Sequence, residues 1–184
     1  SAASDVYKRQ NPATAATCKY TIVTIKTGDD GMVDMDAFNA AIEKHGEDIA
    51  AFMLTNPSTC GLFEPNVKVI ADTLHSIGAY FYCDGANFNA IVGKVLPGDL
   101  GIDVMQINLH KTFSTPHGGG GPGSGPVMVS EALIPYLPIP YVEKKEDGTF
   151  ALIQENETSI GRIKGFHGQF GMMIRALAYM MSHG

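Results

Sequence analysis

Short apolar runs and amphipathic helical patterns alternate along the first two thirds of the chain. Apolar or β-branched runs predict strands over 20–25, 49–54, 79–83, 104–107 and 126–130. Between them, apolar residues at three- and four-residue steps predict a helix that starts after Asp34 and ends at Gly46, and a second helix over 66–77 that ends at Gly78. Strands and helices in this order indicate an α/β fold with a sheet that is at least partly parallel.

The pattern changes after residue 131. Residues 133–140 contain three prolines and predict an irregular crossing segment. Residues 141–153, with a turn at Asp147 and Gly148, predict a β-hairpin. Residues 169–181 predict an apolar helix rich in methionine, which is typical of packing in a core or at a domain interface.

Composition excludes several classes of protein. With 184 residues, 45% hydrophobic and 17% charged, the chain can form a hydrophobic core and is not a disordered tail. Its formal charge of −6 argues against nucleic-acid binding, which needs a basic face. We expect no membrane association, because no apolar run approaches the ~18 residues of a membrane span and the N-terminus lacks a signal-peptide core. Cys18, Cys60 and Cys83 form no C-x-x-C pair and are interpreted as reduced thiols.

Two chemically useful side chains follow neighbouring predicted strands. Asp84 ends the strand over 79–83, and Lys111 follows the strand over 104–107. Because ligands of such sheets bind beyond the carboxyl ends of the strands, we expect both side chains at one edge. Each residue also has a simpler interpretation. Lys111 could be a solvated surface lysine, and Asp84 could be a helix cap or a turn residue. Together, a lysine that forms a Schiff base and an aspartate on a ring nitrogen are the pairing that pyridoxal phosphate requires.

Six of the 21 glycines lie in the sequence HGGGGPGSG, which begins at His117. A P-loop is excluded because the lysine precedes the glycines and no G-K-[ST] follows. An esterase oxyanion loop is disfavoured because G-x-S-x-G is absent, and the flanking strands disfavour a flexible linker. We interpret the segment as a substrate or lid loop with almost no side chains. Its residues are His117, Gly118, Gly119, Gly120 and Gly121.

The histidines do not predict a metal site. His110 and His117 are seven residues apart, and no carboxylate or thiol completes a recognised ligand spacing. His167, between Gly165 and Gly168, remains a candidate functional residue without an assigned role. We therefore expect no metal in the site.

Residues 108–126, with the sequence NLHKTFSTPHGGGGPGSGP, closely resemble the glycine decarboxylases, the pyridoxal-phosphate-dependent P-proteins of the glycine cleavage system. Further segments that resemble motifs of this family are 11–15, 57–61, 84–90, 97–99, 159–162 and 166–168. The resemblance covers about residues 11–184. It implies the type I, aminotransferase-like fold of pyridoxal-phosphate enzymes, here as a partial large domain with a mostly parallel sheet and the start of the C-terminal region that follows.

The same resemblance implies a role for each matching residue. Lys111 is the implied catalytic residue and forms the Schiff base with pyridoxal 5'-phosphate, and Asp84 contacts the pyridine nitrogen. Ala86 lies against the ring and His110 near the phosphate, while Ser58 and Thr59 approach the cofactor or the substrate.

The implied reaction is the decarboxylation of glycine, with transfer of the aminomethyl group to the lipoyl arm of the H-protein. The family implies a dimer or heterotetramer, in the cytoplasm of a bacterium or the mitochondrion of a eukaryote. Neither nucleic acid nor membrane is an implied partner.

We also expect the chain to be a fragment. P-proteins have His-Gly-Thr before their Asn-Pro-Ala motif, whereas this chain has Lys8, Arg9 and Gln10, so we interpret residues 1–10 as a non-native or disordered leader. Residues 11–131 are assigned to part of the cofactor-binding large domain, and 132–184 to the crossing segment, hairpin and helix leading toward an incomplete small domain. Because the family's ring-stacking residues and most of its phosphate site lie upstream, we expect the isolated chain to bind the cofactor poorly and to be inactive.

Two alternatives to glycine decarboxylase remain open at this point. One is another type I pyridoxal-phosphate enzyme, such as a desulfurase or an aminotransferase, although such enzymes usually lack four glycines after the histidine. The other is a non-catalytic structural half of a P-protein, against which the presence of Lys111 and Asp84 argues.

Overall fold

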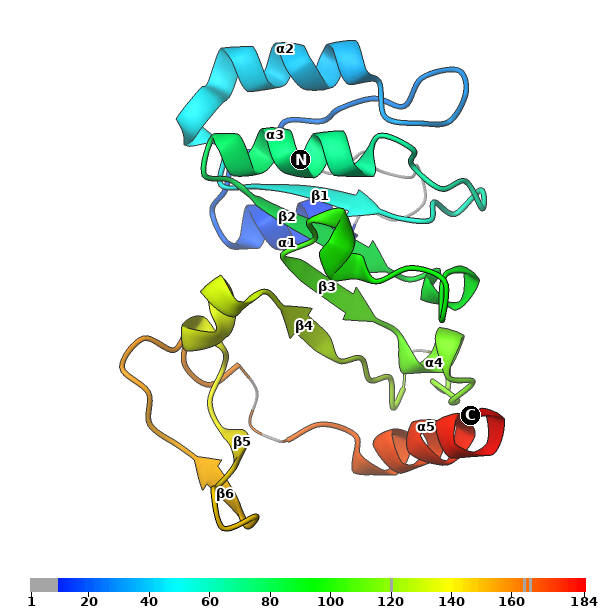
Figure 1. Ribbon diagram of the computed structural model, residues 1–184, viewed down its shortest axis with the longest axis vertical. Coiled ribbons are helices and arrows are strands. Elements are labelled where there is room, and N and C mark those ends of the chain that lie inside the picture. Colours follow the sequence, from blue (N-terminus) through cyan, green and yellow to red (C-terminus); the bar gives the residue numbers. More distant parts are fainter. Residues whose placement is uncertain (1–9, 120, 164, 166) are drawn as a thin grey trace.

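The computed structural model describes residues 10–119, 121–163, 165 and 167–184, and its centre is a four-stranded sheet (Figure 1). The strands lie in the order β1-β2-β3-β4, which are Ala51–Thr55, Tyr80–Gly85, Val104–Ile107 and Val127–Val129. β1, β2 and β3 are parallel, and β4 pairs antiparallel with β3. The predicted α/β fold with a mostly parallel sheet is confirmed.

Two helices, α2 (Met35–His45) and α3 (Val67–Ser76), cover one face of the sheet (Figure 1). The side chain of Asp34 caps α2 by accepting a hydrogen bond from Ala37 N at 3.0 Å. Alternate residues of β1 and β2 point toward these helices and form the centre of the core. The largest side chains of this core are Phe38, Phe52, Ile70, Leu74 and Phe81. Each such side chain contributes about 1.5–3 kcal/mol to stability through burial.

α1 (Gln10–Thr17) and the segment 19–25 line a mostly apolar pocket of about 1040 Å³ together with residues of α2, β1 and β2. The prediction of a strand over 20–25 is wrong. In the described part of the chain this segment has no hydrogen-bonded strand beside it, and the nearby bridge joins Thr27 to Val33 of its own turn. β-Branched residues favour an extended backbone, but a strand also needs a partner.

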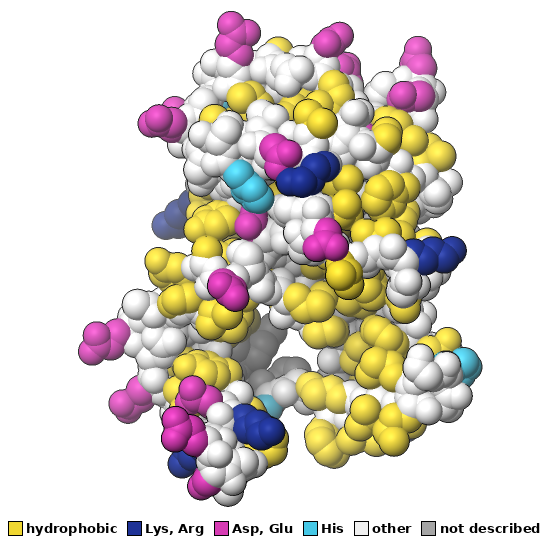
Figure 2. Space-filling view, in the orientation of Figure 1, with side chains coloured by type: hydrophobic (Ala, Val, Ile, Leu, Met, Phe, Trp, Pro, Cys, Tyr) yellow, Lys and Arg dark blue, Asp and Glu magenta, His cyan; other side chains and the backbone are white. Residues whose placement is uncertain are grey.

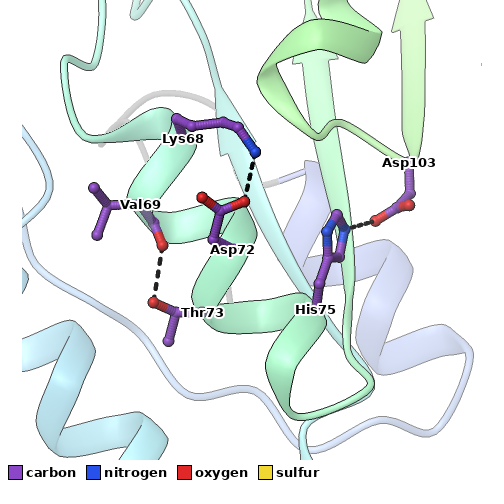
Figure 3. Close-up of polar contacts among 6 residues, drawn as sticks. All are labelled: Lys68, Val69, Asp72, Thr73, His75 and Asp103. Atoms are coloured by element: carbon purple, nitrogen blue, oxygen red, sulfur yellow. Dashed lines mark hydrogen bonds and ion pairs between the residues drawn. The ribbon is translucent and has the colours of Figure 1, made fainter.

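The start of β3 is hydrogen-bonded to both α3 and β2, and Figure 3 shows the contact with α3. Oδ2 of Asp103 lies 2.8 Å from Nε2 of His75, at the end of α3, and accepts a hydrogen bond from Phe81 N at 2.8 Å. The backbone N of Asp103 also donates to Phe81 O at 2.9 Å. These contacts at the amino ends of β2 and β3 fix their relative register, and so also fix which residues meet at their carboxyl ends. The ion pair of Lys68 with Asp72 on α3 is exposed and contributes little.

The remaining part of the chain extends away from the sheet (Figure 1). β5 (Tyr141–Lys144) and β6 (Phe150–Ile153) form the predicted hairpin, and α5 (Phe170–His183) contacts α4 (Leu109–Thr112). The segment expected to be irregular begins inside a 3-10 helix, η4 (Glu131–Tyr136). The shorter elements are η1 (Gly46–Asp48), η2 (Phe88–Ala90) and η3 (Pro97–Leu100).

α5 buries only part of its apolar surface. Met172 and Ala176 are buried, whereas Met181 is 77% exposed and Phe170 is 73% exposed. Apolar side chains gather over this helix (Figure 2). Among the described helices, none combines the length and apolarity needed to cross a membrane. Residues 1–9 of the expected leader, as well as Gly120, lie outside the described residues, and Gln10 begins α1.

Candidate active site

Asp84 lies near the carboxyl end of β2 and is 7% exposed. Its Oδ1 accepts a hydrogen bond from the backbone N of Ala86 at 2.9 Å and another from Nε2 of Gln106 at 2.6 Å. Thr55, Asp84 and Gln106 are register partners on β1, β2 and β3 and form a row across the sheet. The structure thus brings Asp84 and Ala86 together, with a buried carboxylate that is held by two donors.

Lys111 lies in α4, which follows β3 after the single residue Asn108. Lys111 therefore lies at the same edge of the sheet as Asp84, just after the neighbouring strand β3, as the sequence predicts. The side chain is exposed. The described residues alone do not provide the partial desolvation that makes a lysine amine nucleophilic at neutral pH.

The rings of His110 and His117 lie side by side, with centroids 4.7 Å apart and planes inclined by 59°. Burial lowers the pKa of His110 from its ordinary value, and the neighbouring charges of His117 and Lys111 lower it further. The lowered pKa favours the neutral ring, in which one nitrogen donates and the other accepts. This contact joins α4 to the glycine-rich loop.

The loop that contains Ser58 and Thr59 follows β1 and is tied to the end of β2. Nδ2 of Asn87 donates to Pro57 O at 2.9 Å and to Ser58 O at 3.0 Å. Within the loop, Ser58 N donates to Leu62 O at 2.8 Å, and the Ser58 hydroxyl accepts from Leu62 N at 3.3 Å. Ser58 therefore shapes its own loop, and Asn87 holds that loop beside the residues that follow Asp84.

Replacing Asn87 by alanine is expected to loosen this loop. The change removes both hydrogen bonds to the carbonyl groups of the loop, each worth about 0.5–1.5 kcal/mol. Amide exchange at Ser58 and Leu62 should accelerate by about tenfold, measured by hydrogen–deuterium exchange on the full-length protein. The matched control is Asn89→Ala, on the exposed side of η2. Equal exchange rates in the two variants would refute the role of Asn87.

The glycine-rich loop depends on glycine at particular positions. Gly118 and Gly119 have φ angles of +58° and +69°, which L-residues with a side chain rarely adopt. A Cβ at Gly121 would lie 3.2 Å from His117 O. These glycines and His117 are exposed, so the loop presents mostly backbone to the solvent above α4.

Several buried polar atoms in and after α4 have no hydrogen-bond partner among the described residues. They are His110 Nδ1, Thr112 Oγ1 and Thr115 Oγ1. Buried polar atoms are nearly always hydrogen-bonded, so this part of the chain has capacity for a polar ligand. An amine, a buried carboxylate, hydroxyls and an imidazole match the aldehyde, the ring nitrogen and the phosphate of pyridoxal phosphate. The residues present therefore fit this cofactor.

Cys83, beside Asp84, is not a nucleophile. Burial raises its pKa to about 12, and the charge of Asp84 also raises it, so the thiol stays protonated at neutral pH. Its Sγ lies 3.7 Å from Asn56 O. The described residues also contain no cluster of histidine, cysteine and acidic side chains that could hold a metal ion.

Gln106 and Asn87 contribute to the site but were not predicted from the sequence. Gln106 is a polar residue within the apolar strand β3, and that contrast is a signal that sequence reasoning can use. Asn87 lies inside the segment that resembles the family motif at 84–90, but its hydrogen bonds depend on how two loops meet in space.

The model of the aminotransferase class-V family matches residues 10–133. The chain belongs to the aminotransferase class-V family. Proteins of this family are pyridoxal-phosphate-dependent enzymes, which agrees with the donor set at the edge of the sheet.

Sequence relatives confirm the resemblance to glycine decarboxylases. The chain is 58% identical over 179 residues to a probable glycine dehydrogenase (decarboxylating) subunit 2 of Caulobacter vibrioides, covering 95% of this chain and 33% of the relative. A protein of the same name from Alkaliphilus oremlandii is 52% identical, with 95% of this chain and 35% of the relative covered. This class-V chain thus spans about a third of the length of the curated relatives that it matches.

A solved structure confirms the type I fold of the class-V chain. The NifS-like protein from Rickettsia africae superimposes with a TM-score of 0.61 over 98% of this chain and 43% of that one, at 16% identity. At this identity the likeness concerns the fold alone. It gives no support to the alternative of a desulfurase, because the relatives with high identity carry the glycine dehydrogenase name.

Proposed function

We propose that the protein carrying this chain is the pyridoxal-phosphate-dependent subunit of a glycine dehydrogenase (decarboxylating), an oxidoreductase of the glycine cleavage system. One observation carries the proposal: Asp84 and Lys111 lie at one edge of the sheet, at or just after the carboxyl ends of adjacent parallel strands. The chain that holds them is 58% identical to a relative of that name. Residues 11–131 would belong to its cofactor-binding large domain, and 132–184 would lead toward its small domain. This reading disfavours a purely structural half, which has no need of the lysine and the aspartate.

Each residue at the edge has a proposed task. Lys111 Nζ would hold the cofactor through its aldehyde carbon, and the Asp84 carboxylate would face the ring nitrogen. When bound, the cofactor would supply a sink for the electron pair released from the glycine Cα–carboxyl bond. Ala86 has a small side chain and would leave room for the ring near the end of β2.

The neighbouring loops complete the proposed site. The buried atoms of His110, Thr112 and Thr115 would donate to the phosphate, and the loop of Ser58 and Thr59 would border the substrate. The glycine-rich loop, of which His117, Gly118, Gly119 and Gly121 are described, would border the path of a long substrate arm.

The proposed partners follow from the reaction. Glycine would lose its carboxyl group as carbon dioxide, and the aminomethyl carbon would bond to one sulfur of the lipoyl disulfide of the H-protein. The sulfur–sulfur bond would break, and the second sulfur would leave with the electron pair as a thiolate that takes up a proton. The relatives are named as subunit 2, which supports a further subunit and hence a heterotetramer or dimer of halves. The relatives are bacterial, so the proposed compartment is the cytoplasm.

The proposal is tested on the full-length protein assembled with its other subunit. With pyridoxal phosphate added, it should exchange labelled bicarbonate into the carboxyl group of glycine, and borohydride reduction followed by peptide mapping should place the label on Lys111. Alanine offered in place of glycine controls for nonspecific exchange. A label on another lysine would overturn the site assignment, and a labelled but exchange-inactive assembly would favour another pyridoxal-phosphate reaction.

Replacing Gly119 by alanine is expected to slow transfer to the lipoyl arm more than glycine exchange. The φ of +69° makes a side chain costly there by about 1–2 kcal/mol, so the loop would shift, although no atom lies within 4 Å of the added Cβ. Transfer to lipoylated H-protein should fall about fivefold or more while exchange stays within twofold. Gly98→Ala, at a position with no positive φ and open space, is the control. An equal loss of both rates would contradict a gating role.

A further inference from the structure

Gln106 is the nearest polar side chain on β3 to the Asp84 carboxylate. The two residues are register partners on parallel neighbouring strands, and Nε2 of Gln106 lies 2.6 Å from Oδ1 of Asp84. Two acceptors would repel each other, so only the amide nitrogen of Gln106 can face a carboxylate oxygen. The orientation of this amide therefore follows from its partner.

We propose that Gln106 is the positioning residue for Asp84, setting the plane of the carboxylate that meets the ring nitrogen of the cofactor. This inference rests on the proposed function, because it concerns how Asp84 is presented to that nitrogen. Gln106 acts through Asp84 and does not itself need to contact the cofactor.

The backbone alone does not determine how the carboxylate is turned. The terminal torsion of an aspartate side chain has a broad, nearly two-fold distribution, so the group rotates unless donors hold it. Here two donors of different origin meet the same oxygen: the backbone N of Ala86, just past Asp84, and the side chain of Gln106, from the next strand. Two donors on one oxygen fix the plane of the carboxylate relative to both β2 and β3.

Two glycines leave the space that this arrangement needs. A Cβ at Gly85 would lie 2.4 Å from Gln106 O, so only glycine allows β2 and β3 to run this close beside Asp84. A Cβ at Gly125 would lie 2.2 Å from Ile107 O and 3.7 Å from Oε1 of Gln106. Gly125 is therefore required by its close approach to the backbone of Ile107, since 3.7 Å from Oε1 is an ordinary van der Waals distance.

The test replaces Gln106 by methionine, which has a similar length and no N–H to donate. In the full-length holoenzyme, the affinity for pyridoxal phosphate should fall about tenfold. With ¹⁵N-labelled cofactor, the ring-nitrogen chemical shift should move from the wild-type value toward that of Asp84→Asn. Gln106→Asn keeps an amide that is one methylene too short and should behave in the same way. Gln154→Met, at an exposed site after β6, is the matched control.

The readouts separate this inference from the function on which it rests. If both Gln106 variants keep the wild-type nitrogen shift and affinity while Asp84→Asn changes them, the positioning role is overturned and the proposed function stands. Suppose that peptide mapping places the cofactor on Lys111 and that Asp84→Asn leaves the ring-nitrogen shift unchanged. The role of Asp84 in the proposed function is then wrong. A general folding defect would lower the yield of holoenzyme without moving the shift of the population that binds, which also counts against the positioning role.

Discussion

Replacing Lys111 by alanine is expected to abolish covalent attachment of the cofactor and to reduce glycine exchange by at least about a thousandfold, the scale on which enzymes lose activity when a covalent catalytic group is removed. The physical reason is that no other described side chain follows β3 with an amine at this edge of the sheet. The measurement compares the rate of labelled bicarbonate exchange in variant and wild-type assemblies at saturating pyridoxal phosphate.

Lys145→Ala is the matched control for this change. It removes an exposed lysine at the tip of the β5–β6 hairpin, far along the chain from the sheet edge, and should leave exchange within twofold of wild type. Methylamine added to Lys111→Ala provides a second check, since a free amine can condense with the cofactor aldehyde in place of the lysine and should restore part of the exchange. Exchange above a tenth of the wild-type rate in Lys111→Ala without added amine would show that another group carries the reaction.

Replacing Asp84 by asparagine is expected to lower glycine exchange by about a hundredfold or more, because a charge placed against the reacting group is lost while the shape is kept. The asparagine oxygen can still accept from Ala86 N and Gln106 Nε2, so the fold at the end of β2 should survive. The exchange rate at saturating glycine is the measurement, with the cofactor content determined in parallel.

Asp99→Asn controls for the loss of a negative charge away from the site, because Asp99 is exposed in η3, which precedes the amino end of β3, and should tolerate the change. The expected pattern is full cofactor occupancy at high cofactor concentration together with slow exchange. A variant at Asp84 that exchanges within threefold of wild type would show that the carboxylate charge is not used in the reaction.

The parts of the fold that follow from local periodicity are predictable from sequence. α3 was expected over 66–77 and spans Val67–Ser76, and β3 matches its expected range, 104–107. Both have strong apolar patterns with clear ends, so the sequence alone is enough to assign Asp84 and Lys111 to one edge of the sheet.

The features that were not predicted depend on partners distant in sequence. The residues 20–25 have the composition of a strand, yet a strand is defined by pairing, which composition does not supply. The hydrogen bond from Gln106 to Asp84 depends on the β2–β3 register, and the contacts of Asn87 with Pro57 and Ser58 depend on two loops meeting. The exposure of the Lys111 side chain likewise depends on which segments cover this edge of the sheet, and the local sequence around Lys111 does not encode that.

Leu109 holds both ends of the glycine-rich segment through its own backbone. Its carbonyl accepts from Thr115 N at 3.2 Å, and its N–H donates to Ser124 O at 3.0 Å. The segment between Thr115 and Ser124 is therefore a loop whose two ends are both hydrogen-bonded to Leu109 of α4. Insertions or deletions inside this loop change its length without altering the strand register or the position of Lys111. The glycine-rich loop, which would meet the H-protein, is thus the part of the site whose length can change in evolution with the least effect on the other site residues.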